Sequence, residues 1–203
     1  MIIYHVSREE ELPVGEMLQL ENYQLNKMEI DLFPEGLSYH GRKVLTADWY
    51  ESPLSTVDIT KSIKKPSIHI TEYTFELIRK LKFPNMPSRM TSLFALKSLD
   101  DLQYWPELTA SEYSIFRLEV DEIPKEVDAS FLKSGLSQIF IDNPYHSEDT
   151  QFSQAFLADK NWENAIQYWS GEFSNDPRPE LLVSLPVKVL DKMEKFSLPV
   201  KKI

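Results

Sequence analysis

Alternation of hydrophobic and polar positions predicts strands at both ends of the chain and in its middle. Residues 2–6 are β-branched and aromatic and are followed by charged residues, a pattern typical of a strand that ends in a turn or at the start of a helix. Residues 113–120 alternate strictly, which predicts a half-buried strand. Residues 180–190 predict a final strand pair, or one strand bent at Pro186. One face of the middle strand is expected to carry Ser114, Phe116, Leu118 and Val120.

A repeat of three to four residues predicts two helices. The first covers residues 70–81 and ends before Pro84, and the second covers residues 149–168, with a break expected near 159–161. Gly171 suits the C-terminus of the second helix. The apolar face of the first helix is expected to carry Ile70, Tyr73, Leu77, Ile78 and Leu81. Its opposite, polar face is expected to carry Glu72, Glu76, Arg79 and Lys80.

The remaining segments have weaker patterns. Residues 88–96 predict a turn that leads into a strand, and the basic residues 61–65 predict an exposed connector. Residues 13–50 lack clear periodicity and predict loops with one short helix. Long loops of this kind in compact domains usually form lids or binding surfaces. The chain contains no repeat and no clean linker, so we expect residues 1–203 to form a single α+β domain.

Composition narrows the class of protein. The 203 residues include no cysteine, which excludes disulfides, thiolate metal sites and thiol nucleophiles. A net charge of -10 disfavours sequence-blind binding to nucleic acid, because that binding depends on many Lys and Arg contacts with phosphates. No apolar run approaches the roughly 20 residues that cross a bilayer. We therefore expect a cytoplasmic protein that does not insert into a membrane.

Several common catalytic motifs are missing from the sequence. The four histidines are far apart and form no HxxxH pair, so no metal site is expected. The five glycines never cluster into a phosphate-binding loop, and no GxSxG elbow occurs. What remains is a histidine on the first strand, a serine-rich segment after a helix, and a glutamate at the start of a late strand.

These three segments, in this order, resemble the ADP-ribosyltransferase-like superfamily. Residues 4–7, Tyr-His-Val-Ser, are similar to the first-strand motif of that family, and Glu180 before Leu-Leu-Val is similar to its late-strand catalytic glutamate. Residues 88–95 fill the place of the middle motif. The resemblance is to small bacterial domains related to toxins that modify nucleic acid, and it leaves residues 13–65 uncovered. It implies an ADP-ribosyltransferase-like fold of two small packed β-sheets with flanking helices.

The resemblance also implies roles for particular residues. Glu180 is the candidate catalytic residue, because a carboxylate stabilises the positive charge that develops on ribose when the bond to nicotinamide breaks. The implied cofactor is NAD, with His5 orienting it and Ser92 bonding to its ribose. Phe94 or Tyr168 would stack on nicotinamide, and Arg89 would pair with the pyrophosphate. The full set of implied cofactor contacts is Tyr4, His5, Ser7, Arg89, Ser92, Phe94 and Tyr168.

Other interpretations of the same residues stay open. Arg89 alternatively forms a structural ion pair with acidic residues, and His5 and Glu180 alternatively have ordinary structural roles. If active, the protein transfers ADP-ribose to a nucleic acid or protein acceptor, in a toxin or a phage-defence role, and an antitoxin or other partner protein is then expected. Leu93, where related enzymes often carry tyrosine, instead favours a degenerate nucleotide- or partner-binding domain. A third interpretation is an interaction module with an aromatic surface formed by Trp49, Tyr50, Tyr104 and Trp105.

Overall fold

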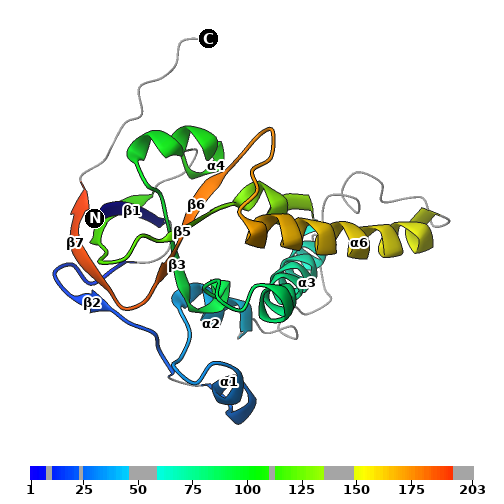
Figure 1. Ribbon diagram of the computed structural model, residues 1–203, viewed down its shortest axis with the longest axis horizontal. Coiled ribbons are helices and arrows are strands. Elements are labelled where there is room, and N and C mark those ends of the chain that lie inside the picture. Colours follow the sequence, from blue (N-terminus) through cyan, green and yellow to red (C-terminus); the bar gives the residue numbers. More distant parts are fainter. Residues whose placement is uncertain (8–10, 23–24, 46–58, 110–112, 135–148, 194–203) are drawn as a thin grey trace, which may run out of the picture.

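The computed structural model describes residues 1–7, 11–22, 25–45, 59–109, 113–134 and 149–193 (Figure 1). The α-helices are α1 (Lys27–Leu32), α2 (Tyr39–Leu45), α3 (Ile59–Lys82), α4 (Pro106–Thr109) and α6 (Asp149–Ser170). The short 3-10 helices are η1 (Arg89–Thr91), η2 (Leu99–Tyr104) and η3 (Ala129–Ser134). The strands are β1 (Ile2–Ser7), β2 (Met17–Leu18), β3 (Ser92–Ala95), β4 (Ser114–Glu119), β5 (Lys125–Asp128), β6 (Pro179–Ser184) and β7 (Val187–Met193).

The strands form two small antiparallel sheets, so the fold is mixed α+β. One sheet has the order β1-β4-β7-β2 and the other has the order β3-β6-β5. The sheets meet where Tyr4 on β1 and Leu96, just after β3, exchange two backbone hydrogen bonds of 2.9 and 2.7 Å. The strands β1, β3 and β6, which carry the three motifs singled out in the sequence, are therefore successive neighbours.

The alternating pattern of β3 and β6 places one set of side chains between the sheets. Leu93, Leu181 and Val183 pack there against Phe116 and Leu118 of β4. Side chains at the positions between them point to the opposite face, because successive residues of a strand alternate. Phe94 and Leu182 accordingly pack in a second cluster with the helices. Glu180 shares that second face, since it lies two positions before Leu182.

The helices α3 and α6 cover this second face of the three-stranded sheet (Figure 1). Phe75 and Ile78 of α3 and Tyr168 and Trp169 of α6 are almost completely buried there. The indole N–H of Trp169 donates to the Phe75 carbonyl at 2.8 Å, which ties α6 to α3. This cluster fixes the helices against Leu182 and so determines what surrounds Glu180.

Three expectations about the helices need correction. Residues 61–65 belong to α3 and are not a connector, and α6 continues through 159–161 without a break. Tyr73, Leu77 and Leu81, expected on the buried face of α3, are 43%, 54% and 65% exposed. Ile78, predicted on the apolar face, is buried as expected, and it shares the buried face with Phe75 and with the two glutamates, Glu72 and Glu76, that the sequence pattern placed on the polar side. Burial of these carboxylates is possible because arginine and serine side chains bond to them.

Most of the strand predictions are confirmed. β1, β3 and β4 form where they were expected, and Gly171 ends α6 with a φ of 78°. Residues 180–190 do form two strands, but β6 and β7 belong to different sheets and do not pair with each other. β5 was not predicted.

The weakly patterned segment from residue 13 to 50 has more structure than expected where it is described. It contains β2, α1 and α2 in place of one short helix. α2 packs closely on η1: the backbone amide and the hydroxyl of Ser38, which precedes α2, both donate to the Met90 carbonyl, at 2.9 and 3.0 Å. These contacts place α2 beside β3.

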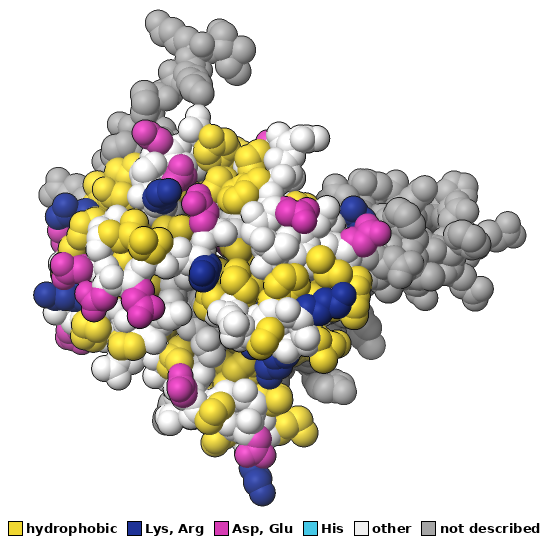
Figure 2. All heavy atoms as spheres, viewed as in Figure 1, with side chains coloured by type: hydrophobic (Ala, Val, Ile, Leu, Met, Phe, Trp, Pro, Cys, Tyr) yellow, Lys and Arg dark blue, Asp and Glu magenta, His cyan; other side chains and the backbone are white. Residues whose placement is uncertain are grey.

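The larger sheet carries exposed ion pairs along β7. Arg117 on β4 pairs with Asp191 on β7, and Lys192 pairs with Glu11 at 2.6 Å. Figure 2 shows acidic and basic side chains intermixed over the end of the molecule that carries β2 and β7. Within the described parts of the chain, the helices include none with the length and apolar character needed to cross a bilayer.

Candidate functional site

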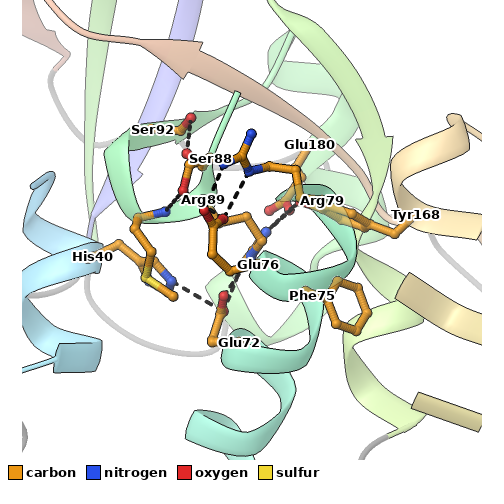
Figure 3. Close-up of polar contacts among 12 residues, drawn as sticks. His40, Glu72, Phe75, Glu76, Arg79, Ser88, Arg89, Ser92, Tyr168 and Glu180 are labelled. Atoms are coloured by element: carbon orange, nitrogen blue, oxygen red, sulfur yellow. Dashed lines mark hydrogen bonds and ion pairs between the residues drawn. The ribbon is translucent and has the colours of Figure 1, made fainter. Parts of the chain in front are cut away.

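A buried ionic network lies between β6 and the two long helices, with Arg89 of η1 at its centre (Figure 3). The guanidinium donates to both carboxylate oxygens of Glu72 on α3, through Nε at 2.9 Å and Nη2 at 3.0 Å. Its Nη1 donates to Glu180 Oε1 and to the Tyr168 hydroxyl, each at 2.5 Å. The Tyr168 hydroxyl in turn donates to Glu180 Oε1 at 2.7 Å. All four side chains are buried, so the network is shielded from water.

The network holds two carboxylates around one guanidinium. Burial by itself raises the pKa of Glu72, but Arg89 and His40 act more strongly together and hold that pKa well below its ordinary value. Burial likewise opposes the charge of Arg89, yet the neighbouring Glu72, Tyr168 and Glu180 raise its pKa well above the usual range. Burial raises the pKa of Tyr168, so its hydroxyl stays protonated and able to donate.

The depressed pKa of Glu72 makes an acid-sensitive contribution to stability. A carboxylate with a folded-state pKa below its unfolded value stabilises the protein above the unfolded value, near 4.5, and loses that contribution as pH falls. We expect the stability advantage of the wild-type protein over Glu72→Gln to shrink as pH falls from 6 to 3, by up to about 1.4 kcal/mol per pH unit. Urea denaturation at each pH measures this difference. A difference that does not vary with pH would contradict the assignment of Glu72 as a buried, charged partner of Arg89.

A second ionic cluster continues the buried face of α3. Arg79 donates to both oxygens of Glu76, at 3.0 and 2.8 Å, and to the Met86 carbonyl at 2.9 Å. The Ser88 hydroxyl donates to Glu76 Oε2 at 2.8 Å. This cluster fixes the segment that precedes η1 against α3, and it therefore sets the position from which Arg89 enters the network.

A cavity of about 360 Å³ is lined in part by Phe94. Its walls come from β1, β3, α2, the segment after β2, and the region of η2 and α4. The volume lies within the range of small-molecule sites. The described residues that line it include His5, Ser7, Ser92 and Phe94, four of the residues predicted to contact a cofactor.

His5 is held in one orientation at the wall of this cavity. Its Nδ1 lies 2.7 Å from the Phe94 carbonyl oxygen. A carbonyl only accepts hydrogen bonds, so Nδ1 carries the proton, and in the neutral ring Nε2 is an acceptor. Burial lowers the pKa of His5, which outweighs the opposing effect of the bond to Phe94. The sequence prediction required a neutral, oriented imidazole, and this geometry provides one.

The other predicted residues lie outside the lining of the cavity. Glu180, Arg89 and Tyr168 belong to the buried network, where Arg89 forms the structural ion pairs that were the alternative interpretation. The ring of Tyr168 packs edge-on against Phe75 and Trp169, at centroid distances of 5.3 and 4.7 Å. Tyr4 alternates with His5 on β1 and packs in a separate cluster with Leu96, Leu102 and Ile115. Ser92, by contrast, lines the cavity, but it is completely buried and donates its hydroxyl to the Ser88 carbonyl at 2.7 Å.

Phe94 connects the cavity with the network. The guanidinium carbon of Arg89 lies 4.4 Å from the centre of the Phe94 ring, a cation–π distance. His40 of α2 contacts the same ring edge-on at 4.8 Å, and its Nε2 lies 3.2 Å from Glu72 Oε1. His40 also lines the cavity. Through Phe94 and His40, the cavity and the network are adjacent layers of one site.

A second, larger groove of about 650 Å³ lies beside the β4–β5 and β6–β7 turns. Its described lining contains three acidic residues, Glu119, Asp121 and Glu122, against the two lysines Lys125 and Lys188. An excess of carboxylates disfavours a ligand that carries phosphates. The cavity beside His5 is therefore the better candidate for a nucleotide.

Sequence reasoning missed Glu72 and His40. Phe75 is the sequence feature that could have identified Glu72, because Glu72 lies three residues before this large apolar residue and therefore on the same face of the helix. A helix that buries Phe75 must bury the side chains around it. His40 has no comparable signal, because the short α2 has no extended periodicity and is positioned by contacts with η1.

Two of the four aromatic residues considered for an interaction surface can be placed. Trp105 lines the cavity and donates its indole N–H to the Pro179 carbonyl at 3.1 Å, whereas Tyr104 is 38% exposed. Trp49 and Tyr50 lie outside the described residues. In the part of the chain that the structure describes, histidines and carboxylates form no group of three or more that could hold a metal ion.

A family model described as "Protein of unknown function (DUF2441)" matches residues 3–195. No curated protein matches the chain.

Proposed function

The chain belongs to the DUF2441 family, and from its own residues we propose that it is an ADP-ribosyltransferase-like protein that binds NAD in the cavity beside His5. The observation that carries this proposal is the fixed, neutral His5 at the wall of a cavity that Ser7, Ser92 and Phe94 also line. A ribose hydroxyl is a donor that matches the acceptor Nε2 of such a ring, and it reaches this buried nitrogen when the side chains that cover it move aside. The aromatic ring of Phe94 offers a face or edge for a nicotinamide or adenine ring.

Binding without turnover is the form of this function that the geometry supports best. A transferase requires a carboxylate next to the ribose at the moment when positive charge develops there. Glu180 lies on β6, and its side chain points toward α3 and α6. Its carboxylate accepts hydrogen bonds from Arg89 and Tyr168. A guanidinium at 2.5 Å offsets the negative charge that the reaction needs.

Transfer of ADP-ribose to a macromolecular acceptor is the second candidate. It is favoured by the adjacency of β1, β3 and β6, which brings the three predicted motifs onto successive strands. Catalysis on this scaffold requires Glu180 to exchange its bond with Arg89 for a contact with ribose. Phe94, which lines the cavity and has Arg89 stacked 4.4 Å from its ring centre, would have to adjust in that exchange.

The test is thermal stabilisation by NAD combined with a measurement of nicotinamide release. For NAD at 100 times its dissociation constant, we expect the unfolding free energy to rise by about 2.7 kcal/mol. His5→Ala is expected to weaken NAD binding about tenfold, because it removes an oriented acceptor. Tyr4→Phe is the matched control: Tyr4 is the preceding residue of the same strand and its side chain packs elsewhere, so NAD binding is expected to stay unchanged.

Release of nicotinamide separates the two forms of the proposal. A binding protein releases none, and Glu180→Gln then leaves the NAD-dependent stabilisation intact. Release by the wild-type protein that disappears in Glu180→Gln, with the ADP-ribose recovered on an added macromolecular acceptor and not as free ADP-ribose from hydrolysis, would identify a transferase. Absence of any stabilisation by NAD would contradict the proposal in both forms.

A further inference from the structure

The cavity has a local charge that differs from that of the whole protein. The chain has a net charge of -10, yet the charged residues among the described lining are Arg42, Lys43 and a single acid, Glu21. Both cations come from the short helix α2, which also contributes His40. A local excess of cations in an acidic protein favours an anionic ligand at that place.

Close contact with η1 fixes the position of α2. A Cβ atom on Gly41 would lie 2.1 Å from the Met90 carbonyl oxygen, so the helix backbone approaches η1 more closely than any other residue would allow. The Ser38 hydroxyl accepts from the Gly41 amide at 3.2 Å and donates to the same Met90 carbonyl at 3.0 Å. The helix that carries the cations is therefore held by backbone contacts.

Arg89, the cation that the sequence suggested for a pyrophosphate, is committed elsewhere. It is 4% exposed, and its guanidinium is bonded to Glu72, Glu180 and Tyr168. Recruiting it to a phosphate would leave two buried carboxylates without their counter-charge, which is strongly unfavourable. Arg42 is in a different situation. Its ion pair with Glu21 is partly exposed, with side-chain exposures of 32% and 56%, and such pairs contribute little to stability.

We propose that Arg42 and Lys43 of α2 bind the diphosphate of a dinucleotide in this cavity. The proposal rests on the proposed function and assigns one part of the NAD site. α2 and α4 lie well apart in Figure 1, with β3 between them, and the cavity has walls from both regions. The diphosphate lies at the α2 wall, where Arg42 exchanges its pair with Glu21 for charge-assisted bonds to phosphate oxygens. The rest of the ligand extends past His5 toward Trp105 and Leu108.

The experiment is calorimetric titration of the full chain with NAD, ADP and adenosine at low and high salt. Arg42→Ala and Lys43→Ala are each expected to lower the affinity for NAD and for ADP about tenfold. The affinity for adenosine, which has no phosphate, is expected to change by no more than about twofold. ADP affinity is expected to fall as salt rises, because the contacts are partly exposed. Glu21→Gln is expected to raise the affinity for NAD and ADP about threefold, because it removes a negative charge beside the phosphates.

Arg117→Ala is the matched control. Arg117 is also an exposed arginine paired with a carboxylate, Asp191, but it lies outside the cavity, so all three affinities are expected to stay unchanged. If NAD binds and neither cation variant weakens it, the diphosphate site is overturned while NAD binding stands. If ADP binds through Arg42 and Lys43 but NAD does not, the phosphate site stands and the proposed function fails. If ADP does not bind the wild-type protein at millimolar concentration, the diphosphate site is overturned.

Discussion

Replacement of Arg89 by methionine is expected to lower the free energy of unfolding by about 3–5 kcal/mol, the largest effect of any single substitution considered for this protein. Arg89 neutralises two carboxylates, Glu72 and Glu180, that are 6% exposed each. Methionine fills a similar volume, so the loss measures uncompensated charge and not a cavity. In a domain of this size, such a loss lowers the melting temperature by roughly 10 °C. Thermal and urea denaturation at neutral pH measure it.

Arg79→Met is the matched control for that substitution. Arg79 also bonds to both oxygens of a glutamate on α3, but among the described carboxylates it pairs with Glu76 alone, and Glu76 keeps its bond from Ser88. We expect a clearly smaller loss of stability. Adding Glu72→Gln and Glu180→Gln to Arg89→Met is expected to recover part of the stability, since no unpaired carboxylate then remains around position 89. A loss below about 1 kcal/mol for Arg89→Met, as for a surface ion pair, would contradict the buried network.

The arrangement of the network gives Phe94 its place in the site. The guanidinium of Arg89 lies over the ring, and it cannot move without leaving the carboxylates of Glu72 and Glu180 unpaired. His40 lies against the edge of the ring and beside Glu72. Phe94 therefore forms a stiff wall for the cavity. Its backbone carbonyl also orients His5, so one residue fixes two parts of the cavity lining. In physical terms, the ionic network preorganises the cavity even though its own charged groups do not line it.

Local patterns in the sequence were sufficient for the strands that carry the site. Residues 2–6 and 113–120 are short runs with clear alternation, and strand register with one buried face is strongly specified by such a pattern. His5, Ser92 and Glu180, which follow one another along the chain, also lie on neighbouring strands, β1, β3 and β6. What alternation alone could not show is that β6 and β7 diverge into different sheets, because that depends on pairing with β3, β4 and β5.

The errors arose where long-range contacts outweigh local pattern. On α3, counting apolar residues favoured the face of Tyr73, Leu77 and Leu81, but Phe75 and Ile78 pack on the sheet. Glu72 is tolerated on that face because Arg89 reaches it from η1, and no window of a single helix contains that information. Glu76 pairs with Arg79 of the same helix and also accepts a bond from Ser88, which lies outside α3. α2 is too short to be stable by itself and depends on its contacts with η1.

Gly41→Ala tests that dependence directly and is expected to reduce both stability and ligand binding. In a helix, alanine is normally preferred to glycine by about 0.5–1 kcal/mol. Here the added methyl group meets the backbone oxygen of Met90 at 2.1 Å, and a backbone atom cannot rotate away as a side chain would. We therefore expect a net loss of about 1–3 kcal/mol in the free energy of unfolding, the range for overpacking. NAD affinity is expected to fall at least about tenfold, because α2 must move and carries His40, Arg42 and Lys43 with it.

Ser38→Ala separates displacement of α2 from simple loss of a contact. It removes the hydroxyl that joins the Gly41 amide to the Met90 carbonyl but introduces no clash, so the expected loss is about 1 kcal/mol, and NAD affinity should change by no more than a few-fold. Both variants are measured by urea denaturation and by titration with NAD. A Gly41→Ala protein that is more stable than the wild type would show that helix propensity prevails and that α2 does not pack on η1 as described. Unchanged NAD affinity in a destabilised Gly41→Ala protein would show that α2 is not part of the binding site.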